Sequence, residues 1–143
     1  SPSKPGPLLD KVVLISDDTP DNIEILIDML DQIGLSDFYL ARNGREAVSV
    51  ATATELDLIY MDIQMPIMNG LDASEKISEL PEHQHTPIIP ITAHSRIVTE
   101  ERCQESGLFG FLQKPVIMDK LYQITEEALC LDEAASVPLR QAV

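Results

Sequence analysis

The chain has 143 residues, a length that suits one domain of ordinary size with short tails. Hydrophobic residues make up 44% of it and charged residues 24%, which supplies a core and argues against global disorder. The formal net charge of −14 argues against direct contact with nucleic acid or an anionic membrane, and it favours metal ions and basic protein faces as partners.

Two further observations concern the environment of the protein. No apolar run approaches the roughly 20 residues that cross a bilayer, so we expect no membrane contact by this domain. The cysteines, Cys103 and Cys130, lack the C-x-x-C spacing of zinc sites and redox motifs. We expect two reduced thiols in a cytoplasmic protein, and a single disulfide is the open alternative.

The chain begins with a tail or linker over 1–10, and the first strand and helix follow. The segment 11–16 holds a short apolar run at 12–15 that is rich in β-branched residues, which is typical of a strand buried on both faces. Thr19 and Pro20 predict a helix start, because threonine caps helices and proline favours their first position. Apolar residues follow at helical spacing, and Gly34 predicts the end of this helix.

The middle of the chain repeats this alternation of strand and helix. Two more strands are expected, at 38–41 and 56–61. Between them, Asn43 with Glu46 three residues on resembles a capping box that starts a helix. The Asn-Gly pair at 69–70 is a turn signal, and a third helix follows that ends before Pro81.

The last third of the chain holds two strands and two helices. A strand at 87–91 is flanked by prolines, which predicts a position near a sheet edge or incomplete pairing. A helix over 95–106 has a poor apolar stripe, and a fifth strand is expected at 108–112. The final helix has a clear apolar stripe over 117–131, and 132–143 is predicted to be a frayed tail or the start of a linker.

Five strand–helix units in series predict an α/β domain over residues 11–131. We expect a doubly wound, five-stranded parallel sheet with five helices on its two faces. In such sheets, ligands bind beyond the carboxyl ends of the strands, at the point where the strand order reverses. This edge is therefore where the sequence predicts chemistry.

Polar residues follow four of the predicted strands, although the strands themselves are apolar. They are Asp17 and Asp18 after the first strand, Asp62 after the third, Thr92 after the fourth and Lys114 after the fifth. Taken singly, the acidic pair could cap a helix, and Asp62 and Lys114 could be ordinary surface residues. The joint pattern is much rarer by chance, and the fold class brings its members to one edge.

Three carboxylates at one edge require positive charge nearby. Each pair about 4 Å apart costs roughly 4 kcal/mol at an effective dielectric near 20. Mg2+ suits this cluster best, because it accepts a few carboxylates and a phosphate completes its coordination. Lys114 adds an ammonium and Thr92 a hydroxyl. The set describes a cradle for a phosphoryl group, with Asp62 as the nucleophile that forms an acyl phosphate.

Four motifs, in this order, resemble those of the receiver domains of response regulators and hybrid histidine kinases. They are V-L-I-S-D-D at 13–18, Y-M-D-I-Q-M-P-I-M-N-G at 60–70, I-T-A at 91–93 and Q-K-P at 113–115. The second motif is highly specific. The resemblance covers the chain from Lys11 to about Leu131 and implies a flavodoxin-like fold of the receiver type.

The resemblance also implies which residues form the phosphorylation site. Asp62 is expected to take the phosphoryl group. Asp18 and Asp62 are expected to bind Mg2+ directly, and Asp17 is expected to assist through water. The backbone carbonyl of Gln64 is a further expected metal ligand.

By the same resemblance, Thr92 and Lys114 contact the phosphoryl group and Phe111 is the aromatic switch residue. The ring is expected to turn inward when Thr92 moves toward the phosphoryl oxygens. Phenylalanine lacks the hydroxyl of the tyrosine frequent at this position, so the switch is expected to work by packing. The bond between Lys114 and Pro115 is expected to be cis.

The implied function is that of a signalling phosphoacceptor rather than an enzyme, although such a domain promotes its own phosphorylation and dephosphorylation. The expected phosphodonor is a histidine kinase or histidine-phosphotransfer domain, and the signal passes to a downstream protein. D-D-T-P-D-N at 17–22 and I-T-A-H at 91–94 favour the receiver of a hybrid kinase. A stand-alone response regulator is the alternative.

Two other readings stay open. A phosphatase of the haloacid dehalogenase type also uses an aspartyl nucleophile, but its usual D-x-[TV] is absent after Asp62, and 143 residues leave little room for its cap domain. A pseudo-receiver that only binds proteins is disfavoured by the complete set of site residues.

Overall fold

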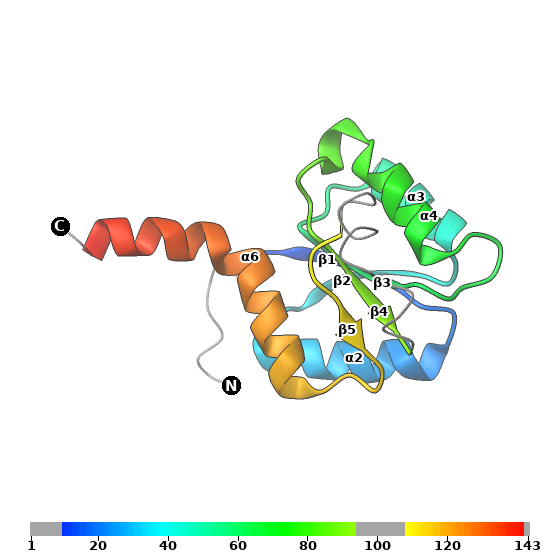
Figure 1. Cartoon of the computed structure of the whole chain (residues 1–143), viewed down its shortest axis with the longest axis horizontal. Helices are drawn as coiled ribbons and strands as arrows, with labels where there is room; N and C mark the ends of the chain where they lie inside the picture. The colour runs from blue at the N-terminus through cyan, green and yellow to red at the C-terminus, as the bar shows by residue number, and fades with distance from the viewer. Residues whose placement is uncertain (1–9, 94–107, 142–143) are drawn as a thin grey trace.

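Five parallel strands form one sheet in the order β2-β1-β3-β4-β5 (Figure 1). The structure is a computed structural model that describes residues 10–93 and 108–141, with 130–141 described by their backbone alone. The strands are β1 (Val12–Ser16), β2 (Asp37–Ala41), β3 (Leu58–Asp62), β4 (Ile88–Thr92) and β5 (Leu112–Gln113). The chain passes from β1 outward to β2 and then back to β3. The strand order therefore reverses between β1 and β3, where doubly wound sheets bind their ligands.

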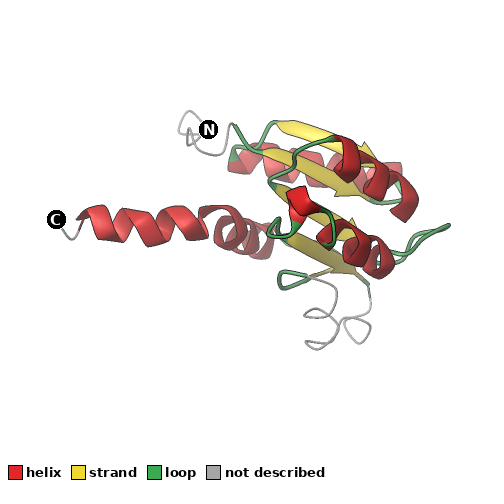
Figure 2. Ribbon diagram, turned by 90° about the horizontal axis from the view of Figure 1, so that it is seen from above, coloured by secondary structure: helices red, strands yellow, loops and turns green. Residues whose placement is uncertain are grey.

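Helices cover both faces of the sheet (Figure 2). They are α2 (Pro20–Ile33), α3 (Gly44–Ala53), α4 (Gly70–Ser78), the short 3-10 helix η1 (Pro81–His83) and α6 (Met118–Gln141). Helices α2 and α6 lie on one face, and α3 and α4 on the other (Figure 1). The predicted doubly wound parallel sheet is confirmed, whereas the helix expected at 95–106 lies outside the described residues. Among the described helices, none combines the length and apolarity needed to cross a membrane.

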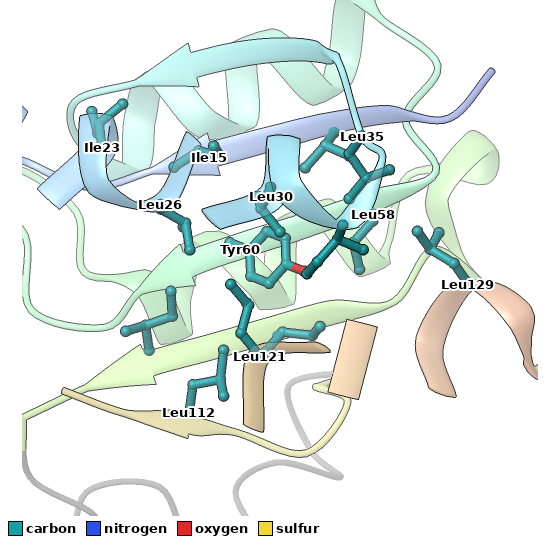
Figure 3. Packing of buried hydrophobic residues seen from close by; sticks show 14 residues of the cluster. Ile15, Ile23, Leu26, Leu30, Leu35, Leu58, Tyr60, Leu112, Leu121 and Leu129 are labelled. Atoms are coloured by element: carbon teal, nitrogen blue, oxygen red, sulfur yellow. The ribbon is translucent and has the colours of Figure 1, made fainter. Parts of the chain in front are cut away.

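Two hydrophobic cores form because successive side chains of a strand point to opposite faces of the sheet. On β3, Tyr60 belongs to the core under α2 and α6, whereas Ile59 and Met61 belong to the core under α3 and α4. Figure 3 shows Tyr60 beside Leu121 in the first of these cores. The Tyr60 hydroxyl also hydrogen-bonds the Thr125 hydroxyl, which ties α6 to the sheet and satisfies both buried groups.

Helix α2 begins and ends at the predicted residues. Thr19 occupies the N-cap position without a side-chain cap bond, and Pro20 is the first helical residue. Gly34 ends the helix with φ of 122°, and its N–H donates to the carbonyl of Leu30 at 3.1 Å. A φ of this sign favours glycine, which explains the residue at this position.

Asparagine side chains cap the next two helices. Asn43 Oδ1 accepts from the Glu46 N–H at 2.9 Å, as the capping box predicts, although Glu46 Oε1 accepts from the Arg42 N–H at 2.7 Å instead of closing on Asn43. Asn69 Oδ1 accepts from the Asp72 N–H at 2.9 Å. The Asn-Gly pair predicted as a turn therefore starts α4.

Strands β4 and β5 pair only briefly, in agreement with the incomplete pairing that the prolines predict. They share two residue pairs, and an isolated bridge joins Ile88 of β4 to Leu108, which precedes β5. Strand β4 lies second from the sheet edge. The fifth strand is shorter than the predicted 108–112. Gly110 explains this correction, because its φ of 60° is incompatible with a regular strand.

The C-terminal segment also corrects the prediction. The residues expected to fray from 132 onward are helical as far as Gln141, because α6 continues through them. Glu133, Ala134 and Ala135 are good helix formers and favour the first part of this continuation. This part of α6 extends away from the sheet (Figure 1).

The hydroxyl of Ser74 in α4 is buried and has no hydrogen-bond partner. A buried hydroxyl without a partner is costly, and alanine forms helices better than serine. We therefore expect Ser74→Ala to raise the free energy of unfolding by about 1 kcal/mol, as measured by urea denaturation at neutral pH. An unchanged or lower free energy would contradict this account of the hydroxyl.

Candidate functional site

Two buried aspartates lie side by side at the carboxyl edge of the sheet. Asp62 ends β3, and Asp17 follows Ser16 of β1, which pairs with Met61 of β3. Asp62 is 2% exposed and Asp17 is 5% exposed. Asp18 is exposed beside them, and one carboxylate oxygen of each of the three residues lies within 4.8 Å of the others. The structure thus brings together the three carboxylates that the sequence singled out.

Lys114 reaches the same cluster from the end of β5. Its Nζ lies 3.4 Å from Asp62 Oδ2 and 3.6 Å from Asp17 Oδ2. Its backbone N–H donates to the Thr92 carbonyl at 2.8 Å, and the bond to Pro115 is cis, as expected. Three carboxylates and one ammonium give a formal charge of −2 (−3 + 1), which fits a divalent cation.

Each buried carboxylate divides its two oxygens between the backbone and Lys114. Asp17 Oδ1 accepts from the Thr19 N–H at 2.9 Å, and Asp62 Oδ1 accepts from the Gln64 N–H at 3.2 Å. Both Oδ2 atoms face the ammonium of Lys114. The backbone bonds fix the carboxylate planes, so that the Oδ2 atoms converge on one point.

Burial, followed by the negative charge of Asp17, raises the pKa of Asp62 from its ordinary 3.8 to about 6. The ammonium of Lys114 and the Gln64 N–H lower that pKa without cancelling the increase. The charged form of Asp62 is therefore disfavoured overall, first by its loss of solvation and second by the charge of Asp17. A bound cation favours that charged form.

The two residues expected to form the switch differ in exposure. Thr92 ends β4 and is fully buried. Phe111 lies just before β5 and is 43% exposed. Phe111 lines a cavity of about 650 Å³. Ile117, which directly precedes α6, and Ile124 of α6 line the same cavity.

The loop after β3 lies unusually close to its neighbours. Gly70 donates its N–H to the Ile63 carbonyl at 2.8 Å, and a Cβ at Gly70 would collide with the Asp62 carbonyl oxygen. Gly44 donates its N–H to the Met68 carbonyl at 3.0 Å. Only glycine permits the approach at Gly70, which keeps the start of α4 against the strand end that carries Asp62.

Two side-chain hydrogen bonds near the cluster were not predicted from the sequence. Ser16 Oγ donates to Met65 Sδ at 3.3 Å, and Arg42 Nη2 donates to the Asp18 carbonyl at 3.3 Å. These bonds join residues 49 and 24 positions apart in the chain. No local signal predicts them, because only the assembled sheet brings the partners together.

A family model supplies the identity of the domain. The model for the response regulator receiver domain matches residues 13–126, a span that includes the whole acidic cluster and Lys114. The chain belongs to this family.

Curated relatives agree with that assignment. The chain is 37% identical over 112 residues to the signal transduction histidine-protein kinase BarA of Escherichia coli (strain K12), and 32% identical over 114 residues to the sensor histidine kinase RcsC of the same strain. These matches cover 78% and 80% of this receiver domain chain but only 12% of each kinase. It is also 30% identical over 119 residues to the polar-differentiation response regulator DivK of Brucella anthropi, which covers 83% of the chain and 96% of that protein.

Solved receiver structures share the fold. One is the receiver domain of a sensor histidine kinase from Pseudomonas aeruginosa PAO1 with a magnesium ion coordinated in its active site cleft. It matches with a TM-score of 0.75 at 28% identity, over 83% of this chain and 97% of that one. The chemotaxis response regulator CheY4 of Vibrio cholerae matches with a TM-score of 0.76 at 25% identity, over 83% and 98% of the two chains.

The raised pKa of Asp62 predicts a pH-dependent stability. The folded state holds the Asp62 proton more tightly than the unfolded chain, since the pKa is about 6 in one and the ordinary 3.8 in the other. This contribution is fully present below about pH 4 and is lost as the pH rises through about 6. We expect Asp62→Asn to match the wild type near pH 4 and to be more stable by about 1–2 kcal/mol at pH 7, because solvent screens part of the effect.

Urea denaturation of both proteins in EDTA, at a series of pH values, measures this difference. Asp37→Asn is the control, because Asp37 is an exposed carboxylate at the opposite end of the sheet. Equal stability of Asp62→Asn and wild type at pH 7 would contradict a raised pKa at Asp62.

Proposed function

We propose that this receiver domain takes a phosphoryl group from a partner's phosphohistidine onto Asp62 and relays it as a signal. The position of Asp62 carries the proposal. It is buried at the end of β3, with Lys114 Nζ 3.4 Å from Oδ2 and oxygens of Asp17 and Asp18 within 4.8 Å. The proposed role is that of a phosphoacceptor rather than an enzyme that turns over a substrate.

The chain's own residues account for the transfer step. At pH 7, Asp62 with a pKa of about 6 is mostly ionised, and the Gln64 N–H holds its Oδ1. Asp62 Oδ2 attacks the phosphorus, an O–P bond forms while the donor's N–P bond breaks, and the electron pair returns to the imidazole. Lys114 offsets the negative charge on the phosphoryl oxygens.

The residues for Mg2+ follow from the same arrangement. Asp18 and Asp62 would hold the ion directly, with the Gln64 carbonyl as a further ligand, and the bound ion supplies positive charge beside the phosphoryl group. Asp17 would assist through water. The −2 charge of the cluster and the magnesium ion in the Pseudomonas receiver support this assignment.

Thr92 and Phe111 are the proposed switch. Phosphorylation adds about −1.5 to −2 charges, and the Thr92 hydroxyl at the end of β4 is drawn toward them. Phe111 then turns from its half-exposed position into the space that Thr92 leaves. The response is a shift in population between two packings.

The wider context is proposed from the relatives. The proposed phosphodonor is a histidine kinase or histidine-phosphotransfer domain, and the signal then passes to a downstream protein. The proposed location of the domain is the cytoplasm. The proposed receiver domain spans residues 11–131 of this chain. The similarity to BarA and RcsC favours a receiver within a larger hybrid kinase, since the match covers 12% of each of these kinases. DivK favours the stand-alone alternative, because the chain matches 96% of its length.

Acetyl phosphate tests the acceptor directly. With Mg2+, the wild type should gain one phosphoryl group per chain by intact mass spectrometry, and Asp62→Asn should gain none, because it lacks the nucleophilic carboxylate. Asp37→Asn should label as the wild type does. Labelling of Asp62→Asn would contradict the proposal, and repeated turnover of a phosphate monoester would favour the haloacid dehalogenase-type phosphatase.

Lys114→Ala should slow that labelling. Removal of one group that stabilises developing charge typically costs about 10²–10³ in rate, and Lys114 Nζ is the ammonium in contact with Asp62. The initial rate of acyl phosphate formation measures the loss. Lys120→Ala, which removes an exposed lysine of α6, is the matched control and should keep the wild-type rate. Equal rates for the two variants would exclude Lys114 from the step.

A further inference from the structure

Ser16 connects the two elements that carry the acidic cluster. It is the last residue of β1, directly before Asp17, and it is 1% exposed. Its Oγ donates at 3.3 Å to Sδ of Met65, which lies in the loop that follows Asp62. A thioether can only accept, so the serine hydroxyl is the donor of this bond.

The bond between Ser16 and Met65 holds the part of the loop after β3 that contains Gln64. Gln64 directly precedes Met65, and its N–H donates to Asp62 Oδ1 at 3.2 Å. The far end of the loop is held separately, where the Met68 carbonyl accepts a backbone bond. Ser16 therefore anchors the near end of the loop, beside the carboxylates.

Packing alone does not require a serine at this position. The sheet neighbours of Ser16 are Ala41 and Met61, and Met65 packs against the same apolar core. An apolar side chain would fit these surroundings without burying a hydroxyl, which is costly unless it is hydrogen-bonded. What the hydroxyl adds is the bond to Met65.

We propose that Ser16 and Met65 are a positioning pair that fixes the backbone of Gln64 and, through it, the carboxylate of Asp62. The inference rests on the proposed function, in which the Gln64 carbonyl and Asp62 bind Mg2+. Neither member of the pair touches the reacting atoms. Both act through Gln64, which they hold in the position that metal binding requires.

Single and double variants test the pair. Ser16→Ala removes the donor, and Met65→Leu removes the acceptor with little change in volume. Each should weaken Mg2+ binding about two- to fivefold, the effect of one modest hydrogen bond, in calorimetric titrations with magnesium chloride. The double variant should bind as weakly as either single variant, because both changes remove the same bond.

A metal-free measurement separates positioning from a general loss of stability. In EDTA, amide hydrogen exchange at Gln64 should accelerate by a similar factor in both single variants. Exchange at Gly44, whose N–H is bound at the far end of the loop, should stay unchanged. Ser74→Ala is the matched control, because it removes a buried hydroxyl that has no partner. It should alter neither Mg2+ affinity nor exchange at Gln64.

The outcomes distinguish this inference from the proposed function. Wild-type Mg2+ affinity and wild-type exchange at Gln64 in both single variants would overturn the positioning pair, and labelling by acetyl phosphate would still stand. Losses that multiply in the double variant would also overturn it. If the wild type took no phosphoryl group, the proposed function would fail, while exchange at Gln64 would still decide whether Ser16 and Met65 hold the loop.

Discussion

The site of this receiver domain depends on the burial of two neighbouring carboxylates, Asp17 and Asp62, at one edge of the sheet. Parallel pairing of β1 and β3 places the two carboxylates side by side, and burial strengthens their repulsion because water no longer screens it. Lys114 and two backbone N–H groups offset part of it. Burial, followed by this repulsion, still keeps the pKa of Asp62 above its ordinary value. The ionised site therefore lowers stability at neutral pH and favours binding of further positive charge.

The rest of the fold holds this unfavourable arrangement in place. β1 and β3 have apolar bodies that are packed from both faces, so their ends cannot separate to relax the charges. The loop after β3 is tied back by Gly70 and Gly44. The same loop contains Ile67, a β-branched residue with φ of 71°. Such a conformation is costly for isoleucine and persists only where its surroundings determine it.

The sequence predicted the parts of this structure that depend on local patterns. Apolar runs fixed the order of strands and helices, and the polar residues after the strands predicted the site, because parallel strands end at one edge. The extent of β5 depended on the backbone of Gly110, which residue type alone does not determine. The bonds of Ser16 to Met65 and of Arg42 to Asp18 join distant segments, so they become visible only when the fold is assembled.

β3 is buried along all five of its residues and has a neighbouring strand on each side. Its side chains alternate between the two cores, with Tyr60 in one and Met61 in the other. A strand of this length spans about 17 Å, from the site at Asp62 deep into the molecule. Since it contributes side chains to both cores, β3 is the element that packs against both helical layers, α2 and α6 on one face and α3 and α4 on the other.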